Sequence, residues 1–257
     1  MNFALVIPTR KDRPEFIKQC EYLISKQTVQ PTEVFWVDYP PKTNKKDITE
    51  RYKLGVEQAT KRGHEFVVFW EDDDWYDKNY LKWIIGEWQK KGKPNFFGVG
   101  ETYYYHLGVE KVHHMQHSGR TSAFCTLVKL PFRCSWPADN YPFLDLHIHK
   151  NASVVSIPFP KDKIYAIGVK HGIGLSGGGG HRSNFRHYKK VVGDWFYNII
   201  GEDSKFYKDM KSKINKIINE VHKQNNNVKI QKRKITPINS NPQLQRRSTK
   251  IRKIRPR

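Results

Sequence analysis

The sequence predicts an α/β fold in which a mixed, mainly parallel β-sheet is flanked by helices. Short apolar segments of strand length alternate with longer segments of helical periodicity between Phe3 and Trp88. Alternation at this spacing is typical of βαβ units, whose strands run parallel. The length of 257 residues is also sufficient to bury the core of one large α/β domain.

The first part of the chain supplies three strands and three helices to this prediction. Apolar side chains recur at helical spacing between Pro14 and Ser25 and define one buried face. Tyr39-Pro40-Pro41 ends a strand, and Gly63 closes the helix that follows it. In chain order, the expected elements are the strand Phe3 to Ile7, the helix Pro14 to Ser25, the strand Glu33 to Asp38, the helix Asp47 to Arg62, the strand Phe66 to Trp70 and the helix Asp77 to Trp88.

The second part of the chain is less regular. The expected elements are strands over Asn95 to Val99, Glu101 to Leu107, Cys125 to Lys129 and Ile164 to Val169, and helices over Phe143 to Lys150 and Phe206 to Val221. From about Asn225 the chain is polar and basic with few large apolar side chains, which is typical of disorder. The sequence therefore predicts one α/β domain over residues 1–204, a C-terminal helix over residues 205–222 and a disordered tail over residues 223–257.

The basic charge is concentrated in this tail. The formal net charge is +21, from 46 Lys and Arg against 25 Asp and Glu. Residues 223–257 hold twelve of the basic side chains and no acidic one, so the remaining 222 residues carry 34 against 25, or +9. Such a tail attracts polyanions, either nucleic acid or an anionic membrane surface. A solvated tail without a specific partner fits the same composition.

The sequence also bears on the compartment. No apolar segment approaches the roughly 20 residues of a membrane span, and the first residues lack the pattern of a signal peptide. Cys20, Cys125 and Cys134 are odd in number and lack the close spacing of a metal site, which suits a reducing environment. We expect a cytoplasmic protein, in the host cytoplasm if a phage encodes it.

An acidic run, Glu71-Asp72-Asp73-Asp74, directly follows the apolar strand that ends at Trp70. Adjacent carboxylates repel one another, and a hard divalent cation such as Mg²⁺ or Mn²⁺ removes that cost because it prefers oxygen ligands. In open α/β sheets the carboxyl ends of the strands are where ligands bind. The run therefore indicates a metal that holds a diphosphate. A solvated acidic turn before the next helix is the simpler alternative.

Four motifs in order make the chain resemble a known family. They are Leu5-Val6-Ile7-Pro8-Thr9-Arg10, the segment from Leu54 through Gly63 to the acidic run, Ser118-Gly119-Arg120-Thr121-Ser122-Ala123-Phe124, and Phe143-Leu144-Asp145-Leu146. Together they resemble the opening strand, acidic DxD segment, acceptor-side loop and later acidic motif of GT-A glycosyltransferases of the large family-two type. The resemblance covers about residues 3 to 185. It implies a Rossmann-like nucleotide-diphospho-sugar transferase fold.

The resemblance also implies roles for individual residues. Asp73 would be the principal metal ligand, helped by Asp72 and by His171, and the ion would be Mn²⁺ or Mg²⁺. The pairs Glu71-x-Asp73 and Asp72-x-Asp74 fit the metal motif as well. The implied donor-binding residues are Pro8, Thr9, Arg10, Asp38, Asp72 and Arg182. The implied acceptor-loop residues are Gly119, Arg120, Thr121 and Ser122.

An inverting transferase needs a base opposite the leaving diphosphate. The resemblance points to Asp145 for this role, with Asp139 as the second candidate. The family usually has Glu-Asp where this chain has Leu144-Asp145, and a surface carboxylate at the start of a helix is the alternative for Asp145.

Three further patterns suggest other chemistry and are given less weight. Gly172-x-Gly174-x-x-Gly177 matches a dinucleotide-binding fingerprint, but too little ordered chain follows it to build a βαβ unit. His106, His113, His114 and His117 lack the spacing of a zinc site. Tyr103-Tyr104-Tyr105 fits a stacking surface for an acceptor, although core packing is the commoner use of aromatic side chains in strands.

The predicted function is metal-dependent transfer of a sugar from a nucleotide sugar, favouring a UDP-sugar, to an acceptor hydroxyl with inversion. The basic charge favours a polyanionic acceptor, and a hydroxylated base in DNA is the first choice, as in enzymes of phages. A cell-surface glycan or a lipid-linked acceptor, with the tail on anionic lipid, is the alternative. A non-enzymatic nucleic-acid-binding protein would leave the acidic run unexplained, and a nuclease would need ligands that the sequence does not offer.

Overall fold

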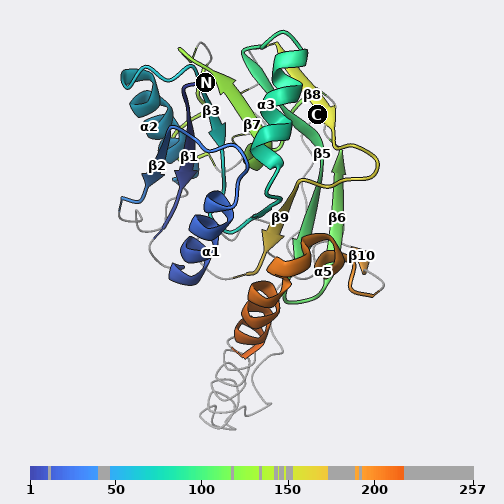
Figure 1. Cartoon of the computed structure of the whole chain (residues 1–257). Helices are drawn as coiled ribbons and strands as arrows, with labels where there is room; N and C mark the ends of the chain where they lie inside the picture. Colours follow the sequence, from blue (N-terminus) through green and yellow to red (C-terminus); the bar gives the residue numbers. More distant parts are fainter. Residues whose placement is uncertain are drawn as a thin grey trace, which may run out of the picture. The chain divides into compact units, whose positions relative to one another are not determined.

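The computed structural model describes residues 1–10, 13–39, 47–116, 119–132, 135–141, 144, 148, 153–172, 189–190 and 193–216 (Figure 1). Residues Met1–Asn215 form one compact unit. Of the remaining unit, Lys216–Arg257, only Lys216 is described. The predicted residues Asp145 and Arg182, the glycine-rich segment after Gly172, and nearly all of the helix predicted over Phe143 to Lys150 lie outside the described residues.

A mixed sheet forms the centre of the fold. Its strands are β1 (Phe3–Pro8), β2 (Glu33–Val37), β3 (Phe66–Phe69), β4 (Trp75–Tyr76), β5 (Phe96–His106), β6 (Lys111–Gln116), β7 (Thr126–Lys129), β8 (Val154–Pro158), β9 (Ala166–Lys170) and β10 (Lys189–Lys190). The main order is β10-β6-β5-β7-β3-β1-β2, while β8 and β9 also pair with β5, and β4 pairs with β9. β1 lies between β2 and β3 and is parallel to both. The antiparallel strand β7 joins β3 to β5.

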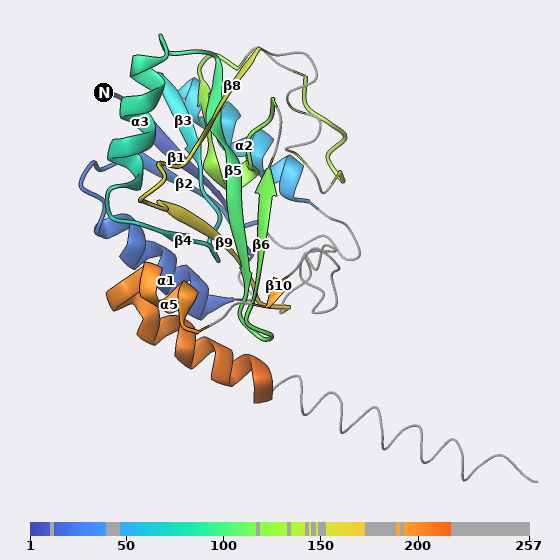
Figure 2. The ribbon, with the colours of Figure 1, turned by 90° about the vertical axis from the view of Figure 1, so that its right-hand side faces the viewer.

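Helices cover both faces of this sheet. They are α1 (Pro14–Ser25), α2 (Ile48–Lys61), α3 (Tyr80–Lys90), α5 (Trp195–Ile200) and a helix over residues 204–216, with 3-10 turns at Ala123–Cys125 and Gly201–Asp203. Figure 2 shows α1 and α3 on one side of the sheet and α2 on the other. Alternate residues of a strand point to opposite faces. Accordingly, Leu5 and Ile7 of β1 join the core under α1 and α3, whereas Ala4 and Val6 join the core under α2.

The predicted α/β class, with a mixed sheet flanked by helices, is confirmed, and β1, α1, α2, β3 and β7 lie where the sequence predicts them to within two residues. Two expectations are wrong. The strands predicted on either side of Gly100 are one continuous strand, β5, which pairs with β7 and β8 in its first half and with β6 and β9 in its second. Helix α3 begins at Tyr80 rather than Asp77, because the Asp77 side chain and carbonyl accept the Asn79 and Tyr80 amides in a turn.

The topology brings several strand ends to one edge of the sheet. Strands β1, β2 and β3 are parallel. β7 is antiparallel to both β3 and β5, so β5 runs parallel to β3, and β9 runs parallel to β5. The carboxyl ends of β1, β2, β3 and β9 therefore lie at the same edge, and the residues that follow these strands can meet there.

Candidate active site

The acidic run follows β3 and is held in place on both sides. Trp70, the residue before it, is buried and stacks on Tyr76 of β4 with ring centroids 3.6 Å apart. The Glu71 amide donates to the Tyr76 hydroxyl at 2.9 Å, and that hydroxyl donates to the Phe124 carbonyl at 3.2 Å. β4 in turn pairs with β9. The carboxylates are thus fixed between the end of β3 and the end of β9.

Asp72 is bound to the end of β1 and to the first residue before α1. Its side chain is 2 % exposed. The Thr9 hydroxyl donates to Asp72 Oδ2 at 2.5 Å, and Arg13 Nη2 donates to Asp72 Oδ1 at 2.8 Å. Both oxygens of Asp72 therefore have a protein partner, and together they connect three segments of the chain.

Asp73 shares one oxygen, Oδ2, with two partners. Arg13 Nη1 donates to it, and His171 Nε2 lies 2.9 Å away. The same Arg13 Nη1 is 3.1 Å from His171 Nε2. His171 is completely buried, and its ring lies 4.6 Å from that of Phe16. Burial opposes the charge of Asp73, but Arg13 and His171 outweigh it and hold the pKa of this carboxyl well below its usual range.

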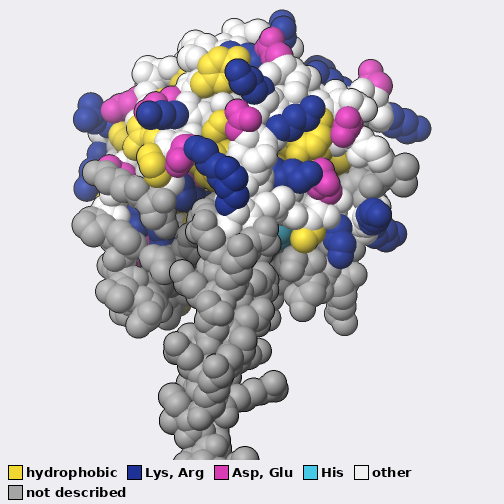
Figure 3. Space-filling model, turned by 90° about the horizontal axis from the view of Figure 1, so that it is seen from below, with side chains coloured by type: hydrophobic (Ala, Val, Ile, Leu, Met, Phe, Trp, Pro, Cys, Tyr) yellow, Lys and Arg dark blue, Asp and Glu magenta, His cyan; other side chains and the backbone are white. Residues whose placement is uncertain are grey.

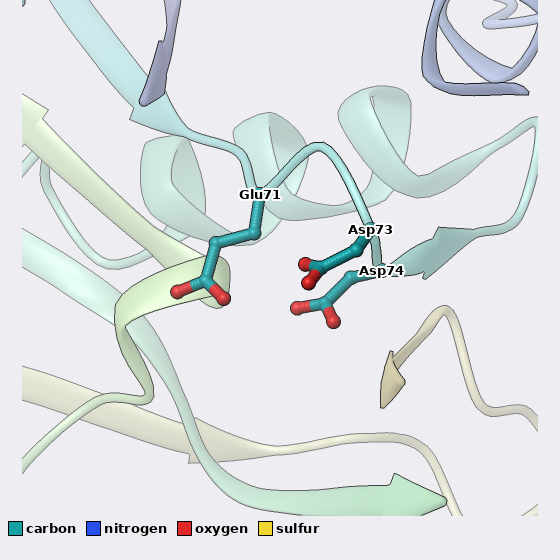
Figure 4. Close-up of side chains that lie close together, drawn as sticks. All are labelled: Glu71, Asp73 and Asp74. Atoms are coloured by element: carbon teal, nitrogen blue, oxygen red, sulfur yellow. The ribbon is translucent and has the colours of Figure 1, made fainter. Parts of the chain in front are cut away.

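Glu71, Asp73 and Asp74 form an acidic cluster (Figure 4). One carboxylate oxygen from each lies within 4.8 Å of the others. Asp74 Oδ1 accepts the Val169 amide at 2.7 Å, whereas the buried Oδ2 has no hydrogen-bond partner among the described residues. Burial, together with the negative charges of Glu71 and Asp73, raises the pKa of Asp74 well above its usual range. The repulsion among these carboxylates therefore favours the protonated form of Asp74, and a bound cation would relieve it.

Lys170, the last residue of β9, supplies a second cation near the cluster. Its Nζ lies 5.0 Å from the centroid of the Tyr104 ring. Burial lowers the pKa of this amine, but the charges of Asp74, Glu71 and Asp73 outweigh it and raise the pKa overall.

The residues present fit a divalent metal. Glu71, Asp73 and Asp74 each offer one oxygen, and these oxygens lie within 4.8 Å of one another. Carboxylate oxygens are the ligands that Mg²⁺ and Mn²⁺ prefer. The buried Asp74 Oδ2 has no hydrogen-bond partner among the described residues, so it is open to a cation. Glu71, Asp73 and Asp74 would hold the ion, and His171 lies beside Asp73.

Of the residues assigned to the donor, Pro8 and Thr9 lie at the carboxyl end of β1, where both are buried. Arg10 is also buried, and its Nη2 donates to Asp47 Oδ1 at 2.6 Å. Asp47 is in turn bound at 2.9 Å by Arg51, whose guanidinium also donates to the carbonyls of Thr9 and Val37. Arg10 thus belongs to a buried group that ties α2 to the ends of β1 and β2. Asp38, the residue after β2, is exposed.

The predicted acceptor loop divides into an exposed and a buried part. Gly119 is exposed with φ 67°, and it lines an open pocket of about 420 Å³ together with Glu101, Gln116 and residues of β8. Arg120 is half-buried. The side chains of Thr121 and Ser122 point inward and share hydrogen bonds of 2.7 and 2.6 Å with Thr126 and Thr102.

The remaining predicted groups are spread over the fold. Asp139 is exposed, and its carboxylate lies 3.8 Å from Lys53 Nζ of α2. Tyr105 is buried and stacks on Phe196, and Tyr103 stacks on His114. The Lys170 amine lies over the ring of Tyr104. Among the described residues, the metal-binding group includes no histidine from 106, 113 or 114, and His117 lies outside them.

Sequence reasoning missed Arg13 and Lys170, and it named Asp74 only within an alternative register of the metal motif. Arg13 stands before Pro14, which begins α1, and a basic residue at that place signals nothing by itself. Its contacts to Asp72, Asp73 and His171 span 59, 60 and 158 positions of the sequence. The signal that could have found Arg13 is electrostatic, because four adjacent carboxylates require cations and the turn after β1 reaches the same sheet edge.

Comparison with known proteins gives structural likeness at low identity. The chain matches the structure of S. aureus TarS with a TM-score of 0.41 and 16% identity over 66% of this chain, and spans 37% of that chain. A structure of TarS 1-349 in complex with UDP-GlcNAc matches with a TM-score of 0.48 and 15% identity over 83% of this chain and 71% of the other. A197 from STIV matches with a TM-score of 0.36 and 12% identity, covering 62% of this chain and 82% of that one. No protein-family model and no curated protein matches the chain.

Proposed function

We propose that this protein is a metal-dependent GT-A glycosyltransferase that moves a sugar from a nucleotide sugar to an acceptor hydroxyl with inversion. One observation carries the proposal: oxygens of Glu71, Asp73 and Asp74, which follow β3, lie within 4.8 Å of one another, and the buried Asp74 Oδ2 has no hydrogen-bond partner among the described residues. The four ordered sequence motifs give the reaction class. A UDP-sugar is the proposed donor, and UDP and UDP-GlcNAc are the ligands named for two of the TarS structures.

In this proposal one group of residues binds the nucleotide-sugar donor and another group activates the acceptor on the opposite side of the sugar. Asp73 would hold the Mn²⁺ or Mg²⁺ ion together with Glu71 and Asp74, and His171, beside Asp73, is the further candidate ligand. When bound, the ion supplies positive charge to the leaving diphosphate. Thr9, Asp38 and Arg182 contact the nucleotide, while Arg10 and Asp72 orient the turn around it.

On the acceptor side, a carboxylate removes the proton of the attacking hydroxyl as its oxygen bonds to the anomeric carbon. The bond from that carbon to the diphosphate breaks, and the nucleotide diphosphate leaves with its electron pair. Asp145 is the proposed base and Asp139 the alternative. Gly119 and Arg120 are the exposed and half-buried residues of the loop proposed to face the acceptor, and Thr121 and Ser122 hold this loop from inside the fold.

The acceptor is proposed from charge. A polyanion suits a chain with a net charge of +21, and DNA carrying a hydroxylated base is the first acceptor to test. A cell-surface glycan or a lipid-linked sugar is the second. Among the described residues, no helix combines the length and the apolar character needed to cross a bilayer.

A donor screen tests the proposed function. The full-length protein should release free sugar slowly from one nucleotide sugar in the presence of Mn²⁺, and that compound should raise its melting temperature. Chelation with EDTA should remove both effects. If no nucleotide sugar is hydrolysed or stabilises the protein with Mn²⁺ present, the proposal fails. The acceptors are then compared by measuring sugar transfer to four compounds: hydroxymethylated duplex DNA, unmodified duplex DNA, a soluble glycan and lipid-linked sugars.

A further inference from the structure

Arg13 is placed to respond to any ion at this site. It directly precedes α1 and is only 9 % exposed, yet its guanidinium contacts side chains that follow β3 and β9. An arginine stays protonated under all ordinary conditions. A permanent positive charge is therefore built into the acidic cluster.

The contacts of Nη1 resemble those of a bound cation. Nη1 lies within hydrogen-bond distance of both Asp73 Oδ2 and His171 Nε2, which are 2.9 Å from each other. Nη1 can only donate, and it donates to Asp73 Oδ2, so this oxygen already accepts a permanent cation. A metal ion bound by Asp73 would meet the guanidinium at the same oxygen.

The other arm of the guanidinium is anchored elsewhere. Nη2 donates to Asp72 Oδ1, and the second oxygen of Asp72 is held by Thr9. Neither Asp72 nor Thr9 belongs to the group of Glu71, Asp73 and Asp74 that could hold a metal. Arg13 can therefore release Asp73 and His171 while Asp72 still keeps it beside the site.

We infer that Arg13 competes with the divalent ion for Asp73 and His171 and so sets how tightly the centre holds its metal. The inference rests on the metal-dependent function proposed above. Competition is reciprocal: whatever the guanidinium gains from these two side chains is lost to the metal, and the reverse. Arg13 is thus a positioning residue that keeps Asp72 and Asp73 paired with a cation at low metal concentration.

The experiment measures Mn²⁺ binding to the full-length protein by the electron paramagnetic resonance signal of free Mn²⁺. The Arg13→Gln variant should bind Mn²⁺ about tenfold or more tightly than wild type, because two cations that share buried acceptors repel each other strongly. The Arg13→Lys variant keeps the charge without the two-armed guanidinium and should fall between them. Arg62→Gln loses the same charge at an exposed position and should bind Mn²⁺ as wild type does.

Thermal melting supplies the second measurement. In EDTA, Arg13→Gln should melt below wild type because Asp72 and Asp73 lose their cation, and added Mn²⁺ should raise its melting temperature by more than it raises that of wild type. If Arg13→Gln does not fold, the test uses the Mn²⁺ affinity of Arg13→Lys instead. Binding of Mn²⁺ by Arg13→Lys that is as weak as in wild type, or weaker, overturns the inference.

Damage to the site and competition give opposite results. If Arg13 only supported the fold, its replacement would weaken Mn²⁺ binding. Equal or weaker Mn²⁺ binding by Arg13→Gln therefore overturns the inference, while the proposed metal site remains supported because both proteins bind Mn²⁺. If neither wild type nor any variant binds Mn²⁺, the metal centre itself fails, and the inference fails with it.

Discussion

Asp72 and Asp73 are neighbours in the sequence but have different partners. Asp72 has Thr9 and Arg13 on its two oxygens, whereas Asp73 faces His171 and the cluster with Glu71 and Asp74. The sequence left three registers open for the metal motif. The structure brings Glu71, Asp73 and Asp74 together, whereas Asp72 is bound by Thr9 and Arg13 at the turn after β1.

Replacement of Asp73 should abolish sugar transfer but leave the protein folded. Asp73→Asn keeps the size of the side chain but removes the charge that a divalent ion requires, so transfer should fall to background and circular dichroism should stay unchanged. Nucleotide binding in this variant should become insensitive to EDTA, as measured by calorimetry with and without Mn²⁺. Wild-type turnover that survives complete chelation would contradict the metal-dependent reaction.

The base should be identified by a pair of conservative variants. Asp145→Asn should lower kcat by about 10² to 10⁴, the usual contribution of positioned general acid–base catalysis, with little change in donor affinity. Asp139 is exposed and lies 3.8 Å from Lys53, so Asp139→Asn should leave turnover nearly unchanged. The reverse pattern of turnover, with Asp139→Asn the impaired variant, would transfer the role to Asp139.

Helix α2 approaches the sheet closely at Gly55. At Gly55, an added Cβ would overlap with Val6 of β1 and lie 3.2 Å from Val37 of β2. Gly55→Ala should therefore destabilise the protein by about 1–3 kcal/mol, the usual cost of overpacking a core. Gly86 of α3 has open space around its Cα, and Gly86→Ala should stabilise by about 0.5–1 kcal/mol.

Urea denaturation measures the free energy of unfolding of both glycine variants. The truncation Val6→Ala removes the methyl group that the new Cβ would meet, so it should cost less in the Gly55→Ala background than in wild type. Additive effects of the two substitutions would show that close approach to β1 is not the reason for Gly55.

The pairing of α2 with β1 and β2 through Asp47 should depend on pH. Burial opposes the charge of Asp47, but hydrogen bonds from Arg51 and Arg10 outweigh it and lower the pKa of this carboxyl. A carboxyl with a lowered pKa in the folded state contributes stability above its unfolded pKa of about 3.9, and loses it as the pH falls through the folded value.

Asp47→Asn should consequently cost about 3 kcal/mol at pH 7, because two buried guanidinium groups lose their counter-charge. The difference in melting temperature between variant and wild type should narrow as the pH falls below about 4. A constant difference from pH 7 down to the acid transition would show that the ion pairs do not contribute.

The elements that the sequence predicts well are those whose apolar pattern is local. α1 and β1 bury their apolar side chains in the register that their sequences indicate. β6, by contrast, has the polar sequence Lys-Val-His-His-Met-Gln and is a strand because it pairs with β5. The same distinction holds for the candidate site. The acidic run can be recognised from adjacent residues, whereas Arg13 is brought to Asp72 and Asp73 only by the fold.

The described body shows no dominant basic patch on the face that Figure 3 presents, where Lys and Arg side chains are mixed with acidic and apolar ones. Residues 223–257 carry +12 of the net charge of +21, because they hold twelve cations and no acidic side chain. If the acceptor is a polyanion, this segment should supply most of the non-specific attraction, and such attraction weakens as salt rises.

Deletion of residues 223–257 should therefore leave the melting temperature and donor hydrolysis unchanged but weaken binding to duplex DNA. The slope of log affinity against log salt should become shallower, because fewer phosphate contacts release fewer counterions. Transfer to a DNA acceptor at moderate salt should lose more in KM than in kcat, since the lost contacts are remote from the reacting atoms. Full-length and truncated proteins with equal DNA affinity and equal salt slope would exclude this role of the tail. Vesicles with anionic lipid serve as the parallel test, because tail-dependent binding to them without binding to DNA would favour the lipid-linked or cell-surface acceptor.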